Sequence, residues 1–122
     1  MTNEILDTLT DALAVIASFT NTEKPDSKIE EKILEEIIDM FERAGIPAKI
    51  NEKELCEKPE YVVIVKPLIF KENYFNNSSP YATSIVVFKD ESLIAYGVVD
   101  HTSELFVRGI GEKVYFQDEP LF

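Results

Sequence analysis

Asp100, His101 and Ser103 lie close together in the sequence, and all three are residue types used in acid–base and nucleophilic catalysis. His101 beside Asp100 could act as a general base. However, Ser103 follows at a spacing that matches no known catalytic triad, and no other nucleophile is placed with the histidine. We therefore interpret His101 as a loop residue.

Cys56 is the single cysteine of the chain. One thiol can form neither an internal disulfide nor a cysteine metal cluster. We interpret Cys56 as a buried or bystander residue.

Lys66, Lys71 and Asn73 form a second polar group that could bind an anion together. Two lysines near one loop are more often solvated, and the net charge of −11 opposes the approach of an anion. The aromatic pair Tyr74-Phe75 and Tyr81 follow. They could form a surface for a partner or pack into the core, and the sequence leaves both interpretations open.

Two amphipathic helices are predicted at the start of the chain. Apolar residues recur at spacings of three and four over residues 3–19, and again after residue 28. For the second helix, Ser27 and Glu30 fit a capping box, and Asp26 is an alternative N-cap. Gly45 stands where a left-handed C-cap is expected.

A series of strands is predicted after the helices. Strands are expected at residues 48–50, 61–65, 83–89, 93–99, 104–107 and 113–116. The unbroken apolar run 61–65 predicts a strand buried on both faces. Asp90-Glu91-Ser92 is a hairpin signal, and residues 71–81 are interpreted as a long loop. The order predicts an α+β fold, in which two N-terminal helices pack on a mainly antiparallel sheet of about five or six strands, in a single domain over residues 1–122.

An ordered string of short motifs runs through the second half of the chain. It consists of Tyr61-Val62-Val63-Ile64-Val65-Lys66-Pro67-Leu68-Ile69-Phe70-Lys71-Glu72-Asn73-Tyr74, Pro80, Ser84-Ile85, Gly97-Val98-Val99, Glu104-Leu105-Phe106, Arg108-Gly109-Ile110-Gly111 and Pro120-Leu121. This string resembles the inositol monophosphatase family of metal-dependent phosphatases. There the apolar strand ends in Asp-Pro-Ile/Leu-Asp-Gly-Thr/Ser-x-Asn-Phe. The resemblance implies the N-terminal half of that family's fold.

The departures from the family motif concern its metal ligands. In the family, the two motif aspartates and a preceding glutamate bind Mg²⁺, which holds the substrate phosphate and activates the attacking water. The resemblance places the first aspartate at Lys66, the second at Ile69, and the glutamate near Glu52 or Glu54. A further aspartate ligand belongs to the family's C-terminal half, outside these 122 residues. We therefore predict no bound metal, no cofactor and no Mg²⁺-dependent phosphatase activity.

Lys66 itself allows two interpretations. Its ammonium could stand in the place of the lost metal and pair with Glu52 or Glu54. Alternatively, it is a strand-end lysine in solvent, as most lysines are.

The composition disfavours several classes of partner. The chain has 12 Lys+Arg against 23 Asp+Glu, and no two basic residues are adjacent, which disfavours nucleic acids and anionic membranes. No apolar stretch reaches the roughly 18 residues of a membrane-spanning helix, and the N-terminus lacks the basic start of a signal peptide. We expect a cytoplasmic protein.

The resemblance also bears on assembly. In the full-length family, the N-terminal sheet and helices pack against a second half of similar size. A chain of this pattern alone should therefore expose apolar surface, and we expect it to form a homodimer with a binding or assembly role. Three alternatives remain: a subunit completed by another chain, a sensor of a phosphate-containing small molecule, or an unrelated α+β domain.

Overall fold

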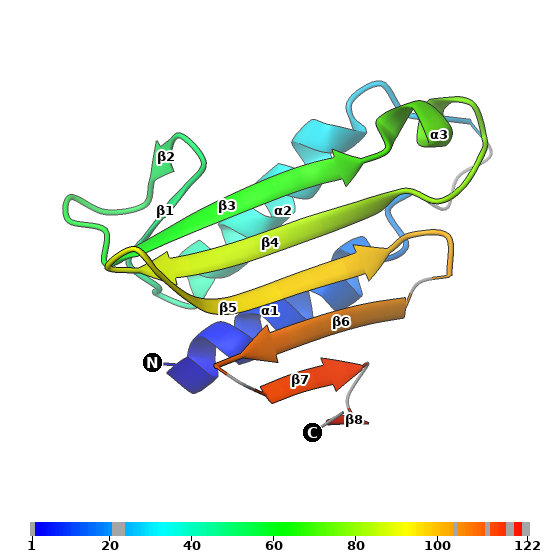
Figure 1. Ribbon diagram of the computed structural model, residues 1–122. Coiled ribbons are helices and arrows are strands. Elements are labelled where there is room, and N and C mark those ends of the chain that lie inside the picture. The colour runs from blue at the N-terminus through cyan, green and yellow to red at the C-terminus, as the bar shows by residue number, and fades with distance from the viewer. Residues whose placement is uncertain (1, 21–23, 104, 112, 117–118, 121–122) are drawn as a thin grey trace.

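The structure, a computed structural model, describes residues 2–20, 24–103, 105–111, 113–116 and 119–120. Two long helices, α1 (Thr2–Ile16) and α2 (Ile29–Arg43), lie on one face of a sheet (Figure 1). Helix α1 contacts the sheet at β5 and β6, and α2 contacts it at β3. No helix in the described part of the chain is long and apolar enough to cross a membrane.

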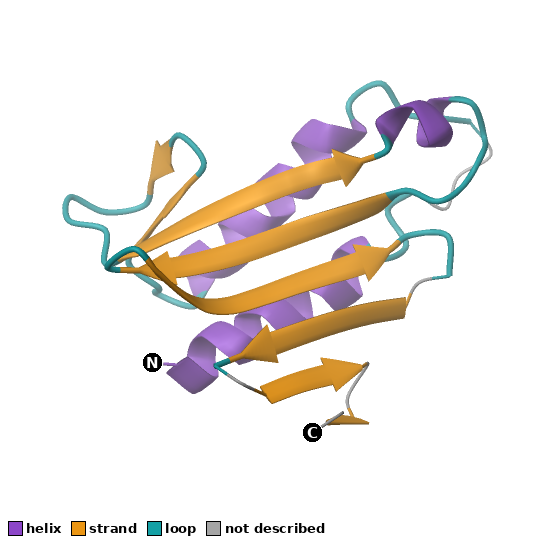
Figure 2. Ribbon diagram, in the orientation of Figure 1, coloured by secondary structure: helices purple, strands orange, loops and turns teal. Residues whose placement is uncertain are grey.

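The described strands form one sheet in the order β2-β1-β3-β4-β5-β6-β7-β8 (Figure 2). Their bounds are β1 Ala48–Ile50, β2 Lys53–Glu54, β3 Tyr61–Ile69, β4 Ala82–Lys89, β5 Ser92–Asp100, β6 Leu105–Ile110, β7 Lys113–Phe116 and β8 Glu119–Pro120. Strands β1 and β3 pair in parallel, and the other neighbours are antiparallel. The predicted α+β fold is confirmed, with two-residue strands β2 and β8 beyond the expected six. Glu104, which the prediction placed in a strand, lies outside the described residues.

The start of α2 differs from the prediction. Lys28 is the N-cap and no side chain caps the helix, so the capping box of Ser27 and Glu30 is wrong. Asp26 contacts the start of the helix instead: its Oδ1 accepts a hydrogen bond of 2.9 Å from the backbone N–H of Lys28. The predicted end is confirmed: Gly45 has a φ of 69°, in the left-handed region.

Two connections between strands have a defined backbone structure. Asp90 and Glu91 both have positive φ (50° and 65°) and join Lys89 to Ser92, as in a two-residue type I′ hairpin. The expected loop 71–81 is wrong in its first part, since residues Lys71–Phe75 form the short helix α3.

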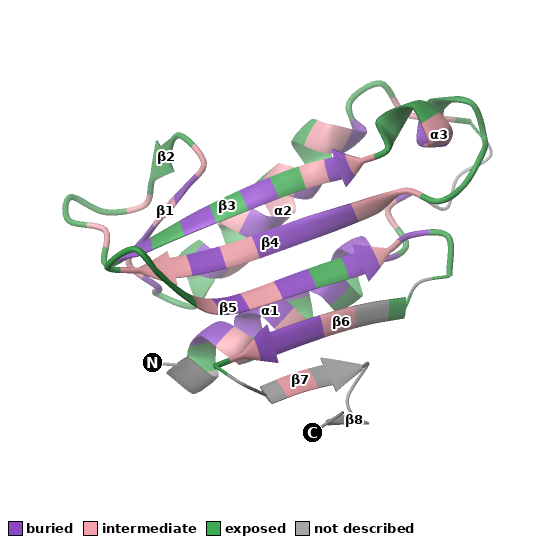
Figure 3. Cartoon of the chain, in the orientation of Figure 1, coloured by how far each residue is buried: buried purple, intermediate pink, exposed green. Residues whose placement is uncertain are grey.

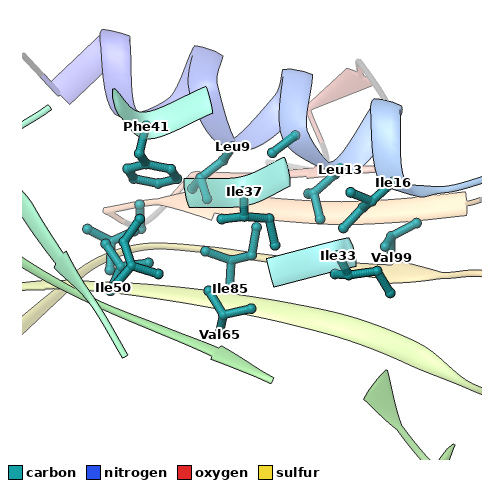
Figure 4. Close-up of a cluster of buried hydrophobic side chains, with 14 of the residues drawn as sticks. Leu9, Leu13, Ile16, Ile33, Ile37, Phe41, Ile50, Val65, Ile85 and Val99 are labelled. Atoms are coloured by element: carbon teal, nitrogen blue, oxygen red, sulfur yellow. The ribbon is translucent and has the colours of Figure 1, made fainter. Parts of the chain in front are cut away.

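The core lies between the two long helices and the sheet (Figure 4). Leu9, Leu13 and Ile16 of α1 and Ile33, Ile37 and Phe41 of α2 are fully buried against Val65, Ile85 and Val99. Helix α1 comes so close to β5 that a Cβ added to Gly97 would lie 2.7 Å from Cδ1 of Leu13. Burial of these side chains from water is the main force that holds the two layers together.

The other face of the sheet is not covered by α1 or α2. In β3, Tyr61, Val63 and Val65 are buried, whereas Val62 is 47% and Ile64 is 44% exposed, so the predicted burial on both faces is wrong (Figure 3). The strand registers place the alternate residues of β4, β5 and β6 on the same side. We call this side of β3 to β6 the open face; it carries Val62, Ile64, Val86, Phe88, Val98 and Leu105.

Candidate functional site

The end of β3 and the helix α3 hold the residues that the sequence singled out. Val65 points into the core, so the next residue, Lys66, is on the open face and exposed. The pairing of β3 with β4 shifts register between Lys66 and Ile69, and Ile69 lies opposite Ala82. Phe70 follows in the left-handed region (φ 60°) and turns the chain into α3.

Asn51 joins the turn after β1 to this strand end. Its Nδ2 donates to the carbonyl of Val65 (3.1 Å), and its Oδ1 accepts from the N–H of Val65 (2.8 Å). The fold thus brings the segment with Glu52 and Glu54 beside the strand that carries Lys66. Both glutamates are exposed, and the salt bridges among the described residues do not include Lys66. This arrangement fits a solvated strand-end lysine better than an ion pair that replaces a metal.

Asn73 stabilises the loop that follows α3. Its Nδ2 donates to the carbonyl of Pro80 (2.8 Å), and its own carbonyl accepts from the N–H of Ser78 (2.7 Å). Lys71 is exposed at the start of α3. The amide of Asn73 is therefore used to close the loop, which leaves the two lysines as the cationic groups of the suggested anion site.

The donors at this strand end do not fit a divalent metal. Mg²⁺ requires oxygen ligands in near-octahedral geometry. The side chain of Ile69 has no donor atom, and the ammonium of Lys66 repels a cation. Within the ranges that the structure describes, no group of three His, Cys, Asp or Glu side chains could hold a metal ion.

Tyr74 connects α3 to the start of α2. It is buried, and its hydroxyl accepts a hydrogen bond of 2.6 Å from the N–H of Asp26. The ring packs edge-on against Tyr81 (5.4 Å) and Phe75 (5.0 Å). Of the three aromatics, Tyr74 is in the core and Tyr81 is half-buried against it, while Phe75 is 41% exposed. The Lys32 ammonium, hydrogen-bonded to Asp26, holds the pKa of that carboxyl below its ordinary value.

A hollow of about 300 Å³ lies next to this aromatic cluster. It is lined mainly by hydroxyl, amide and aromatic groups: Thr20, Pro25, Tyr74, Asn77, Ser78, Ser79, Tyr81 and Thr102. None of the remnant metal-site residues lines it, so it is separate from the end of β3.

His101 is in a turn, as expected, but it is buried, with 4% exposure. Its Nδ1 lies 3.2 Å from the carbonyl of Ala17, and its Nε2 lies 2.7 Å from Oγ1 of Thr83. The Thr83 hydroxyl also donates to the carbonyl of Pro67 (2.6 Å). Burial lowers the pKa of the imidazole from its ordinary value of 6.5. These contacts join the residue after α1 to β4 and to the end of β3. The buried ring is not accessible to a substrate.

The other two side chains that the sequence singled out for possible chemistry are Asp100 and Cys56. The carboxylate of Asp100 accepts hydrogen bonds from the N–H of Thr102 (2.9 Å) and the hydroxyl of Ser103 (3.1 Å), which closes the turn after β5. Cys56 is exposed, so of the two interpretations the bystander is the one that fits.

The structural roles of three groups were not predicted from the sequence: Asn51, the Tyr74 hydroxyl and the buried His101. Each acts through a contact with a residue at least 14 positions away. A local sequence pattern contains no signal for such contacts. Asn51 alone carried a hint, since asparagine tolerates the left-handed conformation that it adopts (φ 52°).

Solved structures share this fold. The extragenic suppressor protein suhB from Bartonella henselae matches 94% of this chain with a TM-score of 0.77 and 16% identity, over 52% of its own length. An inositol monophosphatase from Anabaena matches 95% with a TM-score of 0.79 and 17% identity, over 48% of its length. The inositol monophosphatase of Thermotoga maritima matches 93% with a TM-score of 0.75 and 14% identity, over 51% of its length.

The chain therefore has the fold of about half of an inositol monophosphatase. It spans about half the length of the proteins that it matches, which is consistent with the N-terminal half that the motifs implied. The resemblance is confirmed at the level of the fold. No known family profile and no curated protein matches the sequence.

Proposed function

We propose that this chain is a catalytically inactive, inositol-monophosphatase-like half-domain that works as a binding or assembly protein in the cytoplasm, as a homodimer. The observation that carries the proposal is the pair Lys66 and Ile69, which stand where the resemblance places two aspartate ligands of Mg²⁺. The overall fold around them is that of the solved inositol monophosphatases. In this chain the turn into α3 and the Asn51 contacts with Val65 build the strand end.

The lost chemistry follows from charge and donor type. A phosphatase of this kind needs a metal to neutralise the phosphate and to lower the pKa of the attacking water. An ammonium can attract a phosphate, but it cannot generate a hydroxide nucleophile. His101, the single histidine of the chain, is not available as a general base at this strand end, because its side chain is buried.

Phosphate release is the direct test. The purified chain is incubated with inositol monophosphate or fructose bisphosphate and Mg²⁺, with the Anabaena inositol monophosphatase as the positive control. We expect release at the rate of the blank. Release that depends on Mg²⁺ and on protein concentration would contradict the proposal.

A reverse substitution tests whether these two positions are the cause. In the double variant Lys66→Asp/Ile69→Asp, two carboxylates return oxygen donors to the strand end. We expect millimolar Mg²⁺ or Mn²⁺ to raise the melting temperature of this variant by a few degrees and to leave that of the wild type unchanged. A metal-induced shift in the wild type would show that this chain holds a cation without those aspartates.

The assembly part of the proposal is supported by exposed apolar side chains. Val62, Ile64, Val98 and Leu105 are each 40 to 47% exposed. Contiguous apolar patches of this kind mark interaction sites more often than free surface. We expect a solution mass of twice the 13.9 kDa of one chain at micromolar concentration. A monomeric mass would count against a homodimer.

A further inference from the structure

The open face carries apolar side chains that lie next to one another on neighbouring strands. Ile64 lies opposite Val86 and Val62 lies opposite Phe88, so their side chains form continuous rows across the strands. In β6, Gly109 has no side chain, and the ring of Tyr96 lies where a Cβ at Gly109 would stand, 2.3 Å from Cζ. The aromatic ring thus fills the gap that the glycine would otherwise leave in the surface.

The charges of the molecule are concentrated away from this face. Among the described residues of β3 to β6, the strand registers place one acidic residue, Asp100, on the open face, and its carboxylate accepts hydrogen bonds from Thr102 and Ser103. Within the described parts of these strands, Lys66 is the one cation on that face. By contrast, α2 alone contains six acidic residues: Glu30, Glu31, Glu35, Glu36, Asp39 and Glu42.

This distribution of charge favours a second copy of the chain as the partner that covers the open face. Two chains that each carry a charge of −11 repel one another over most of their surface. On the open face the described residues of each copy present one carboxylate, Asp100, which accepts hydrogen bonds from its own turn. A strongly basic partner would be attracted to the outer side of α2 instead, and the open face offers it no charge complementarity.

The size of the face is sufficient for a specific dimer. The four strands β3 to β6 have six to nine residues each. At about 3.3 Å per residue and about 4.8 Å per strand, they give a projected area of about 500 Å² per copy. Two copies would bury about 1,000 Å², the lower limit of a stable interface, before the relief of the side chains is counted. A sheet-on-sheet contact also supplies each copy with a second packed layer.

We propose that two copies of this chain pair through their open faces, sheet against sheet about a twofold axis, with Ile64 and Val98 in the contact. This inference rests on the proposed homodimer and adds the surface that forms it.

The test is a charge placed on the open face, compared with the same charge elsewhere. Ile64→Glu alters the open face, and Val15→Glu alters a residue of α1 with similar exposure (41% against 44%). Sedimentation equilibrium gives the dissociation constant of each. We expect Ile64→Glu to weaken the dimer by about 100-fold or more, because apposed or buried unpaired carboxylates oppose association. Val15→Glu should leave the constant within about threefold of the wild type.

Two results would overturn the inference, and they differ in what they say about the proposed function. If the wild type is a dimer and both variants stay dimeric, the interface lies elsewhere and the homodimer itself stands. If the wild type is a monomer, both the open-face inference and the proposed homodimer are wrong. Val98→Glu is a second variant for the case in which Ile64→Glu does not fold, which circular dichroism and a melting curve show. Val98→Glu is expected to weaken the dimer in the same way, and a dimer unchanged by it rules out the open face.

Discussion

The buried side chain of His101 connects separate parts of the fold. Its burial also limits protonation of the imidazole ring. A neutral imidazole has one N–H, and the Thr83 hydroxyl supplies one proton more. These two protons serve three contacts, with the carbonyls of Ala17 and Pro67 and between the two side chains. A second proton on His101 would complete the set, but burial opposes the charge more strongly than the Ala17 carbonyl and Asp100 favour it, so the pKa is lowered.

This lowered pKa predicts a loss of stability in mild acid. As the pH falls below 6.5, the unfolded chain binds a proton at His101 that the folded chain resists, so the free energy of unfolding decreases. This effect acts over the pH range in which the imidazole of the unfolded chain takes up its proton, around its ordinary pKa of 6.5 and below. His101→Asn removes this effect, while the carboxylates titrate equally in both proteins. Urea unfolding at about pH 7.5 and about pH 5.5 should show a smaller loss in the variant. Equal losses would contradict the assignment.

At the scale of the elements, the β4–β5 hairpin carries conformational strain that a substitution can relieve. Asp90 and Glu91 are both in the left-handed region, where a residue with a Cβ is disfavoured by about 1 kcal/mol. Glu91→Gly should therefore raise the free energy of unfolding by about 0.5 to 1 kcal/mol. The matched control is Glu57→Gly, at an exposed position without positive φ, which should be neutral or destabilising. Urea unfolding of the two variants measures the difference, and destabilisation by Glu91→Gly would show that the turn is not strained.

The same elements show how far sequence reasoning extends. The helices and the longer strands follow from periodicity and turn residues, because these are local properties of the chain. The exposure of Val62 and Ile64 could not be predicted, since an apolar run has the same pattern whether its second face packs inside the chain or remains uncovered. Helix α3 has five residues, too few for a periodic signal.

For the candidate site, the sequence showed which residues replace the metal ligands, but it did not show the contacts that surround them. Lys66 and Ile69 were found because their chemical types differ from those of a metal ligand. The Asn51 contacts with Val65 and the hydrogen bond from Asp26 to Tyr74 were not, because each joins segments that only the fold brings together.

At the scale of the whole molecule, the balance between net charge and the apolar open face determines how assembly responds to salt. Each copy carries a charge of −11, while the part of the open face that the structure describes carries one lysine and one aspartate. Repulsion between the copies acts through solvent and is screened beyond about 10 Å at 0.1 M salt. The apolar contact is not weakened by sodium chloride at these concentrations, because it depends on the removal of side chains from water.

The dimer should therefore become tighter as salt is added. Between 20 mM and 500 mM sodium chloride, we expect the dissociation constant from sedimentation equilibrium to fall by about tenfold, equivalent to about 1.4 kcal/mol of relieved repulsion. An interface held by pairs such as Lys66 with an acidic residue of the second copy would respond in the opposite direction, because salt screens attraction as it screens repulsion. Lys66→Gln separates the two cases: it should leave the salt dependence of an apolar interface nearly unchanged. A dissociation constant that rises with salt in the wild type, and loses that rise in Lys66→Gln, would assign the association to ion pairs instead of the open face.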